Sequence, residues 1–220
     1  MNIVGLLAWY DESPEMLATC VSGFARVCDQ IVAVDGAYAL YPQAKPRSHP
    51  VQASTILHAA ESAGVGCLIH RPREVFYGNE VEKRNFSLNL ARSFEPDWVL
   101  VFDADFQVSE CHAELVREDL KRADANVATY ELRDEWGKQP FRGIYRWSES
   151  LVYGPAHFDV NGIYANQDEI LRGERGEAYP LQIQTLVAYH VEERSQERRN
   201  AATAFDRVRN LSGIEDHVVA

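Results

Sequence analysis

The most informative segment of this chain is Asp97-Trp-Val-Leu-Val-Phe-Asp-Ala-Asp-Phe106. Its apolar run, Trp98–Phe102, is typical of a buried strand. Asp103 and Asp105 follow at the carboxyl end of that strand, which is where open α/β sheets bind ligands. Two carboxylates so close repel each other unless a cation lies beside them, and hard oxygen donors suit Mg²⁺ or Mn²⁺, which can in turn hold a diphosphate. The stretch therefore predicts a strand with a metal site at its end; the alternative is a strand followed by an ordinary polar turn.

The first half of the chain alternates strands with helices. Several of the helices open on a start signal, such as Ser13-Pro14 or the pair Asn79 and Glu82, which resembles a capping box. Strand–helix units in series predict an α/β fold with a mostly parallel sheet and right-handed crossovers. The predicted strands are Asn2–Ala8, Ile31–Val34, Gly66–His70 and Trp98–Phe102; the predicted helices run from Ser13 through Cys28, over Val51–Ala63, from Asn79 to about Arg92, and from a Ser109 cap through Val116, Leu120 and Ala123.

The second half is more irregular. Strands are predicted over Val127–Leu132, Gly143–Val152 and Leu181–Tyr189, and a closing helix over Glu192–Leu211. Because no repeat, low-complexity tract or linker interrupts the chain, we expect one domain over residues 1–220. Its nucleotide-binding half covers about residues 1–125, and its acceptor-binding half about residues 126–220.

Charge and composition exclude some classes of function. The 220 residues hold 33 acidic side chains against 22 Lys and Arg, a net charge of −11. Such a balance argues against a broad surface for nucleic acid or anionic lipid. The four cysteines are scattered without a metal-binding spacing, so we expect reduced, mostly buried thiols. No apolar run approaches the roughly 18 residues of a membrane span, and no signal-peptide pattern is visible, so we expect a cytoplasmic protein.

Three polar strand ends are predicted to meet at one edge of the sheet, since parallel strands bring their carboxyl ends together. Trp9 or Tyr10 could stack on a base, and Asp35 could accept a hydrogen bond from a base N–H or a ribose hydroxyl. The alternative is that Trp9 belongs to the core and Asp35 to a simple turn. We also expect the long loop after Asp35 to order over a bound donor. The three ends are Ala8-Trp9-Tyr10-Asp11-Glu12, Asp35-Gly36-Ala37-Tyr38 and Asp103-Ala104-Asp105.

With these residues in place, the sequence resembles the family-2-like glycosyltransferases of the GT-A fold. Those enzymes share an acidic turn after the first strand, an Asp-rich turn after the second, an Arg-Asn helix before the fourth, and an Asp-x-Asp signature at its end. The matching residues are Tyr10-Asp11-Glu12, Val34-Asp35-Gly36, Lys83-Arg84-Asn85 and Phe102-Asp103-Ala104-Asp105. The resemblance covers about residues 2–125. The chain departs from it in lacking the usual Asp-Asp-Gly-Ser run after the second strand.

The resemblance implies roles for the donor site. Asp35 would contact the base, Lys83 or Arg84 the base or diphosphate, and Asp103 the ribose or metal. Asp105 would bind the Mn²⁺ or Mg²⁺ directly and so take part in catalysis, the cation acting as a Lewis acid on the diphosphate. The remaining residues expected around the donor are Ala8, Trp9, Tyr10, Glu12, Gly36 and Ala104.

Two further residues complete the expected site. His190 resembles in placement the C-terminal histidine that many GT-A enzymes supply as a metal ligand; a solvent-exposed histidine at a helix entry is the alternative. Asp168, in Asp168-Glu169, resembles the acidic pair on the acceptor side and is our candidate for the catalytic base of an inverting enzyme. A retaining enzyme would need no such base, so the stereochemistry stays open.

The resemblance implies a metal-dependent enzyme that moves a sugar from a nucleotide-diphospho-sugar, a UDP-sugar above all, to a hydroxyl of a protein, lipid or glycan. A haloacid-dehalogenase-type phosphatase is a poorer match, because its Asp-x-Asp usually lies near the N-terminus and precedes Gly-Thr, where Phe106-Gln107 follows here. A nucleotidyltransferase would need a Gly-rich loop after the first strand. A binding module without turnover also stays open, as does the oligomeric state, a homo-oligomer included.

Overall fold

The computed structural model describes residues 1–39, 41–75, 77–134, 137–153, 160–161, 181–191, 200 and 204. In these ranges the helices are α1 (Pro14–Phe24), α2 (Pro50–Ser62), α3 (Glu80–Ala91) and α4 (Ala113–Arg122), with a 3₁₀ turn at Arg92–Phe94. The strands are β1 (Ile3–Trp9), β2 (Gln30–Asp35), β3 (Gly66–His70), β4 (Trp98–Asp103), β5 (Phe106–Cys111), β6 (Val127–Asp134), β7 (Gly137–Arg146), β8 (Val152–Tyr153), β9 (Val160–Asn161) and β10 (Leu181–His190).

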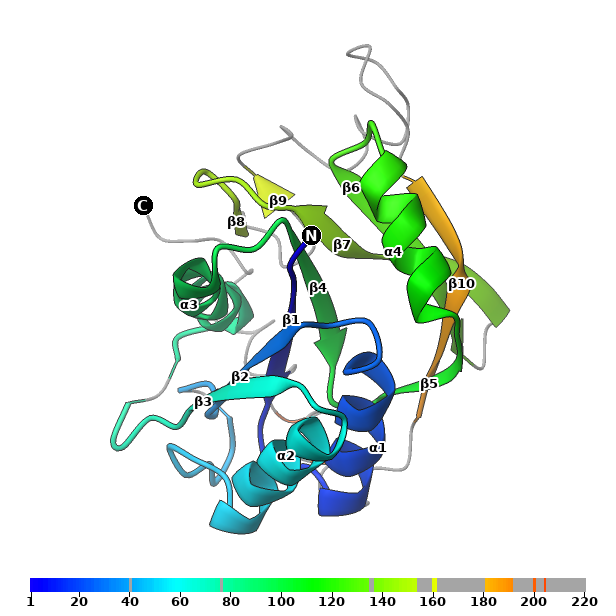
Figure 1. The fold of residues 1–220 in the computed structure, drawn as a ribbon. Helices are drawn as coiled ribbons and strands as arrows, with labels where there is room; N and C mark the ends of the chain where they lie inside the picture. Colours follow the sequence, from blue (N-terminus) through cyan, green and yellow to red (C-terminus); the bar gives the residue numbers. More distant parts are fainter. Residues whose placement is uncertain are drawn as a thin grey trace.

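Eight of these strands form one sheet in the order β3-β2-β1-β4-β7-β6-β10-β5, and β8 pairs with β9 apart from it (Figure 1). The strands β3, β2, β1 and β4 are all parallel, which confirms the prediction from the first half of the sequence. Beyond β4, the strands β7 and β5 run antiparallel to their neighbours, while β6 and β10 pair in parallel. The result is a mostly parallel α/β sheet that continues from one half of the chain into the other.

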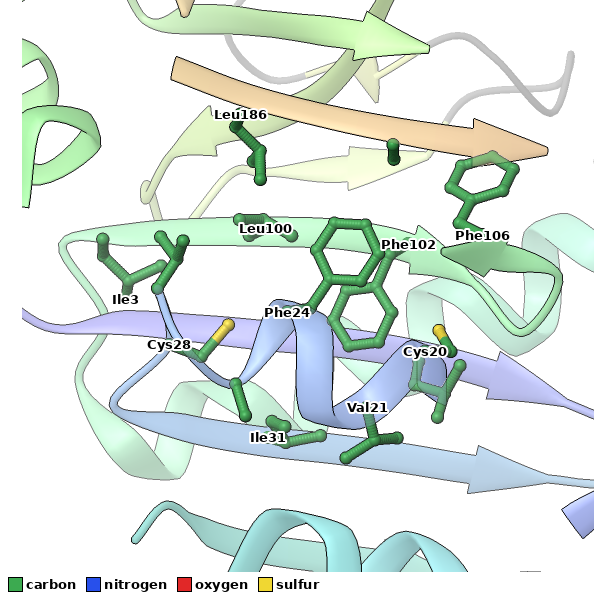
Figure 2. Packing of buried hydrophobic residues seen from close by; sticks show 14 of the residues in the cluster. Ile3, Cys20, Val21, Phe24, Cys28, Ile31, Leu100, Phe102, Phe106 and Leu186 are labelled. Atoms are coloured by element: carbon green, nitrogen blue, oxygen red, sulfur yellow. The ribbon is translucent and has the colours of Figure 1, made fainter. Parts of the chain in front are cut away.

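Helices cover both faces of the sheet. One apolar core lies on the side of α1, α2 and α4, and a second lies on the side of α3. In the first core, Phe24 of α1 stacks on Phe102 of β4 with ring centroids 4.3 Å apart (Figure 2). Burying each such ring stabilises the fold by about 1.5–3 kcal/mol. The alternation along β4 follows from strand geometry: Leu100 and Phe102 face the first core, and Val99 and Val101 the second.

Two predicted helix starts are confirmed. Ser13 caps α1 by accepting a hydrogen bond from the Met16 N–H at 3.0 Å. Asn79 caps α3 in the same way through the Glu82 N–H at 2.8 Å. The predicted reach of the first helix to Cys28 is wrong, since α1 ends at Phe24. The chain turns there, and Cys28 enters the core beneath Gly5, where a Cβ would lie 2.8 Å from its sulfur.

Two other expectations are corrected by long-range strand pairing. Ser109 does not cap a helix but lies in β5, which pairs with β10; α4 begins at Ala113. The strand predicted over Gly143–Val152 is instead β7, which starts at Gly137 because it forms a hairpin with β6. Tertiary pairing overrides local propensity at both places.

The predicted closing helix falls almost wholly outside the described residues, and the division of the chain into a nucleotide-binding and an acceptor-binding half stays a prediction. Within the described ranges, none of the helices combines the length and the apolar character that crossing a membrane requires.

Candidate functional site

The polar strand ends meet as the sequence predicts. In the parallel register, Ala8 of β1 lies beside Asp103 of β4, and Trp9 lies beside Asp35 of β2. Strand alternation then places Asp35 on the face of α1 and α2, and Asp103 on the face of α3. The carboxyl edge of the sheet therefore carries acidic groups on both of its faces, around the ends of three neighbouring strands.

Asp35 is fully buried and organises the loop that follows it. The Ser48 hydroxyl donates to Asp35 Oδ1 at 2.6 Å, and the Ser48 N–H lies 3.0 and 3.1 Å from the two carboxylate oxygens. Arg71 donates through Nε to Asp35 Oδ2 at 3.2 Å and through Nη2 to the Ser48 carbonyl at 2.6 Å. Asp35 thus holds the loop after β2 and the arginine after β3 in one network. Its contact with a base stays a prediction, and sequence reasoning missed Ser48 and Arg71 altogether.

Lys83 lies in α3 with only 2% of its surface exposed. Its Nζ donates to the carbonyl oxygens of Trp9 and Gly36, both at 2.7 Å, and lies near the rings of Tyr38 and Tyr77. Lys83 therefore ties the end of β1 to the end of β2. The buried ammonium group therefore stabilises the strand ends themselves. The contact of Lys83 with the donor stays a prediction.

Arg84, the next residue of α3, reaches the Asp-x-Asp turn. Its Nη2 donates to Asp103 Oδ1 at 2.9 Å, and its Nε donates to Glu80 Oε1 at 2.7 Å. Burial lowers the pKa of Arg84, but the carboxylates of Asp103 and Glu80 outweigh it and hold that pKa well above its ordinary value. Burial raises the pKa of Asp103, opposed by Arg84 and reinforced by Asp105. Arg84 therefore orients the first carboxylate of the motif.

Asp105 is 4% exposed and lies against His190, the last residue of β10. His190 Nε2 and Asp105 Oδ2 are 3.1 Å apart, and the Val191 N–H donates to the Asp105 carbonyl at 2.8 Å. On the other side, the buried thiol of Cys20 donates to the Asp103 carbonyl at 3.3 Å. The structure thus brings together His190 and the Asp-x-Asp turn, 85 residues apart in sequence, as the resemblance implied.

The chemistry of these side chains fits a divalent cation. Asp105 and His190 offer a carboxylate oxygen and an imidazole nitrogen at one point, a donor pair suited to Mn²⁺. Asp103 has one oxygen engaged by Arg84. Within the ranges that the structure describes, no group of three or more His, Cys, Asp or Glu side chains is arranged to hold a metal by itself. A cation bound there would take only part of its coordination shell from the described residues, and diphosphate oxygens would have to supply the rest.

The other predicted donor residues have different environments. Trp9 is buried in the first core, as its alternative interpretation held, whereas Tyr10 is partly buried with its ring edge-on to Tyr41. The Tyr10 hydroxyl accepts from the Lys45 N–H at 2.9 Å. Glu12 is buried beyond the end of β1, and Ala104 is buried in the turn. Asp168, the predicted catalytic base, lies outside the described residues.

No protein-family model and no curated protein matches the chain. Among solved structures, TarS of S. aureus matches with a TM-score of 0.50 and 11% identity, covering 96% of this chain and 40% of TarS. A mycobacterial protein matches with a TM-score of 0.53 and 14% identity, covering 94% of this chain and 72% of that one. The chain thus spans less than half the length of TarS. At such identities the likeness shows the fold, which is GT-A-like; membership of family 2 stays a prediction.

Proposed function

We propose that this protein is a metal-dependent glycosyltransferase that moves a sugar from a UDP-sugar to an acceptor hydroxyl. The observation that carries the proposal is the Asp-x-Asp turn at the carboxyl edge of a GT-A-like sheet, with Arg84 on Asp103 and His190 on Asp105. Solved structures hold TarS 1–349 with UDP and with UDP-GlcNAc, which makes UDP-sugars the first donors to test.

The nucleoside is proposed to bind across the ends of β1 and β2. Lys83 links these two ends, and Asp35 with Arg71 forms a polar network that holds the loop after β2. Tyr10, partly buried at the same edge, is the ring proposed to stack on the base. Asp103 neighbours Ala8 in the sheet, and the ribose is proposed to extend toward this carboxylate.

Asp105 and His190 are the residues proposed to hold Mn²⁺ or Mg²⁺. Such a cation, when bound, offsets the negative charge that develops on the departing diphosphate. Arg84 keeps Asp103 oriented and adds positive charge next to the Asp-x-Asp turn. The Asp103 carboxylate therefore needs little reorientation when the sugar is transferred. The proton of the acceptor hydroxyl requires a base in an inverting reaction, and Asp168 is proposed for that role.

The proposal is tested by incubating the protein with UDP-glucose, UDP-galactose, UDP-GlcNAc or UDP-glucuronate in Mn²⁺ and measuring released UDP. Transferases of this kind hydrolyse their donor slowly when water replaces the acceptor, so we expect Mn²⁺-dependent release with one donor. Asp105→Asn should abolish the release of UDP. Asp124→Asn, the same substitution at an exposed residue just after α4, should leave it unchanged. Donor binding without any release would support a binding module instead, and the absence of both would refute the proposal.

A further inference from the structure

Arg142 of β7 is a partly buried arginine whose charge nothing in the described structure neutralises. Its Nη1 is buried and makes no hydrogen bond, and its side chain forms no ion pair with any residue of the described ranges. A buried guanidinium nitrogen without an acceptor costs free energy, so proteins seldom keep one that has no use. Neighbouring arginines do have partners: Arg84 of α3 binds Asp103, and Arg146 of β7 donates to the Ala123 carbonyl at 2.6 Å.

The register directs Arg142 toward the end of the sheet that carries the candidate site. β7 lies between β4 and β6 (Figure 1). Tyr145 of β7 pairs with Val99 of β4 and belongs to the core under α3, so it faces the same side of the sheet as Asp103. Arg142 pairs with Thr129, one step after a register shift that skips Gly143. Running antiparallel to β4, this part of β7 extends toward the carboxyl end of β4, where Asp103 lies.

A glycine is required at the register shift. A Cβ on Gly143 would lie 2.6 Å from the ring of Tyr130, so a side chain there would have to displace that buried ring. The shift keeps Arg142 on the face of α3, because Phe141, the residue before it, packs against Tyr130 in the first core. The backbone therefore directs this arginine to the face of Asp103 rather than into the first core.

Electrostatics supports the same arrangement. Burial raises the pKa of Tyr145 well above its ordinary value, and the guanidinium groups of both Arg84 and Arg142 oppose that rise. The two arginines therefore both act on the phenol of Tyr145. Arg84 is balanced by Asp103 and Glu80, whereas the Arg142 side chain has no carboxylate partner among the described residues.

We propose that Arg142 binds an oxyanion of the substrate, a phosphate or carboxylate group, on the side of Asp103 away from the nucleoside. A planar guanidinium is the group best suited to hold such an anion through two parallel hydrogen bonds. Two sources carry this chemistry: the diphosphate of the donor, and an acidic group on the acceptor. The proposal rests on the proposed function only in naming these two sources.

The test is isothermal titration of the wild-type chain and of Arg142→Gln with four oxyanion probes and one neutral probe. Pyrophosphate and UDP report on the donor source; glycerol 3-phosphate and glucuronate, added with UDP and Mn²⁺ present, report on the acceptor source. We expect the Kd of one pair of probes to rise at least about tenfold in Arg142→Gln, because a hydrogen bond from a charged donor is lost. Glycerol, the neutral probe, should show no difference. Arg142→Lys should keep part of the affinity because it keeps the charge.

Arg146→Gln is the matched control. This arginine also lies in β7, but its guanidinium stacks on Trp98 at 4.5 Å and bonds to backbone carbonyls. Its loss should lower the melting temperature and leave oxyanion affinity unchanged. Arg142→Gln, in contrast, should melt no lower than the wild type, since it removes an uncompensated buried charge.

The proposal is overturned if no oxyanion probe binds the wild type, if every probe binds Arg142→Gln as tightly, or if that variant is destabilised with unchanged affinities. Pyrophosphate binding that depends on Arg142, without any Mn²⁺-dependent binding of UDP, would uphold the proposal and count against the proposed function alone.

Discussion

Replacing Lys83 by Met tests how the donor edge is built. The substitution keeps the length of a side chain that is 2% exposed but removes its ammonium. Two hydrogen bonds of 2.7 Å, to the carbonyls of Trp9 and Gly36, are lost, and with them the direct link that Lys83 makes between the ends of β1 and β2. The rings of Tyr38 and Tyr77 also lose the cation they flank.

The expected cost follows from these contacts. Each hydrogen bond from a charged donor contributes about 1.5–3 kcal/mol. Part of that loss is recovered because the variant no longer removes an ammonium group from water. We therefore expect Lys83→Met to lower the free energy of unfolding by about 2–4 kcal/mol, measured by urea denaturation at pH 7. UDP affinity should fall too, since the two strand ends are no longer held at a fixed spacing.

Lys121→Met is the control, because Lys121 is exposed in the last turn of α4. Its free energy of unfolding should stay within about 0.5 kcal/mol of the wild type. If Lys83→Met changed stability as little as this control, the two carbonyl contacts would not hold the edge together, and the assignment of Lys83 to the framework of the site would be refuted.

Three further outcomes are expected. Gly36→Ala should lower the free energy of unfolding by more than about 1 kcal/mol, because Gly36 has φ +127° and a Cβ would lie 2.9 Å from the Tyr77 ring; an unchanged urea midpoint would contradict this. The four thiols should react slowly with a colorimetric thiol reagent at pH 8 and quickly in denaturant, since burial raises their pKa values, that of Cys67 to about 12; rapid native labelling of Cys67 would count against it. Burial lowers the pKa of His70 below its ordinary 6.5, with Asp35 opposing. The unfolded chain then binds more protons, so stability should fall as the pH drops below about 6.5, and less so in His70→Gln.

Much of the fold follows from local sequence. The strand over Trp98–Phe102 and the helix starts at Ser13 and Asn79 were predicted correctly. Each of these features depends on only a few neighbouring residues. β5 and β7 could not be placed in this way. β5 pairs with β10, and β7 pairs with β4 as well as with β6, so each has a partner distant in sequence; Phe106 and His190, which pair, are 84 residues apart.

The site was predictable where topology alone determines it. Parallel strands had to bring Asp35 and Asp103 to one edge, and they do. The partners of these carboxylates were not predictable, since Arg71 is 36 residues from Asp35 and lies after another strand. Arg142 had no local signal either, because the face of the sheet that it occupies depends on a register shift in a hairpin.

The most direct test of a metal-dependent nucleotide-sugar site is isothermal titration of UDP into the wild-type protein with and without Mn²⁺, repeated with Asp105→Asn and Asp124→Asn. We predict binding that requires Mn²⁺, that Asp105→Asn abolishes without loss of folding, and that Asp124→Asn leaves unchanged. UDP binding that is indifferent to Mn²⁺ and to Asp105, or no binding of UDP at all, would contradict the account.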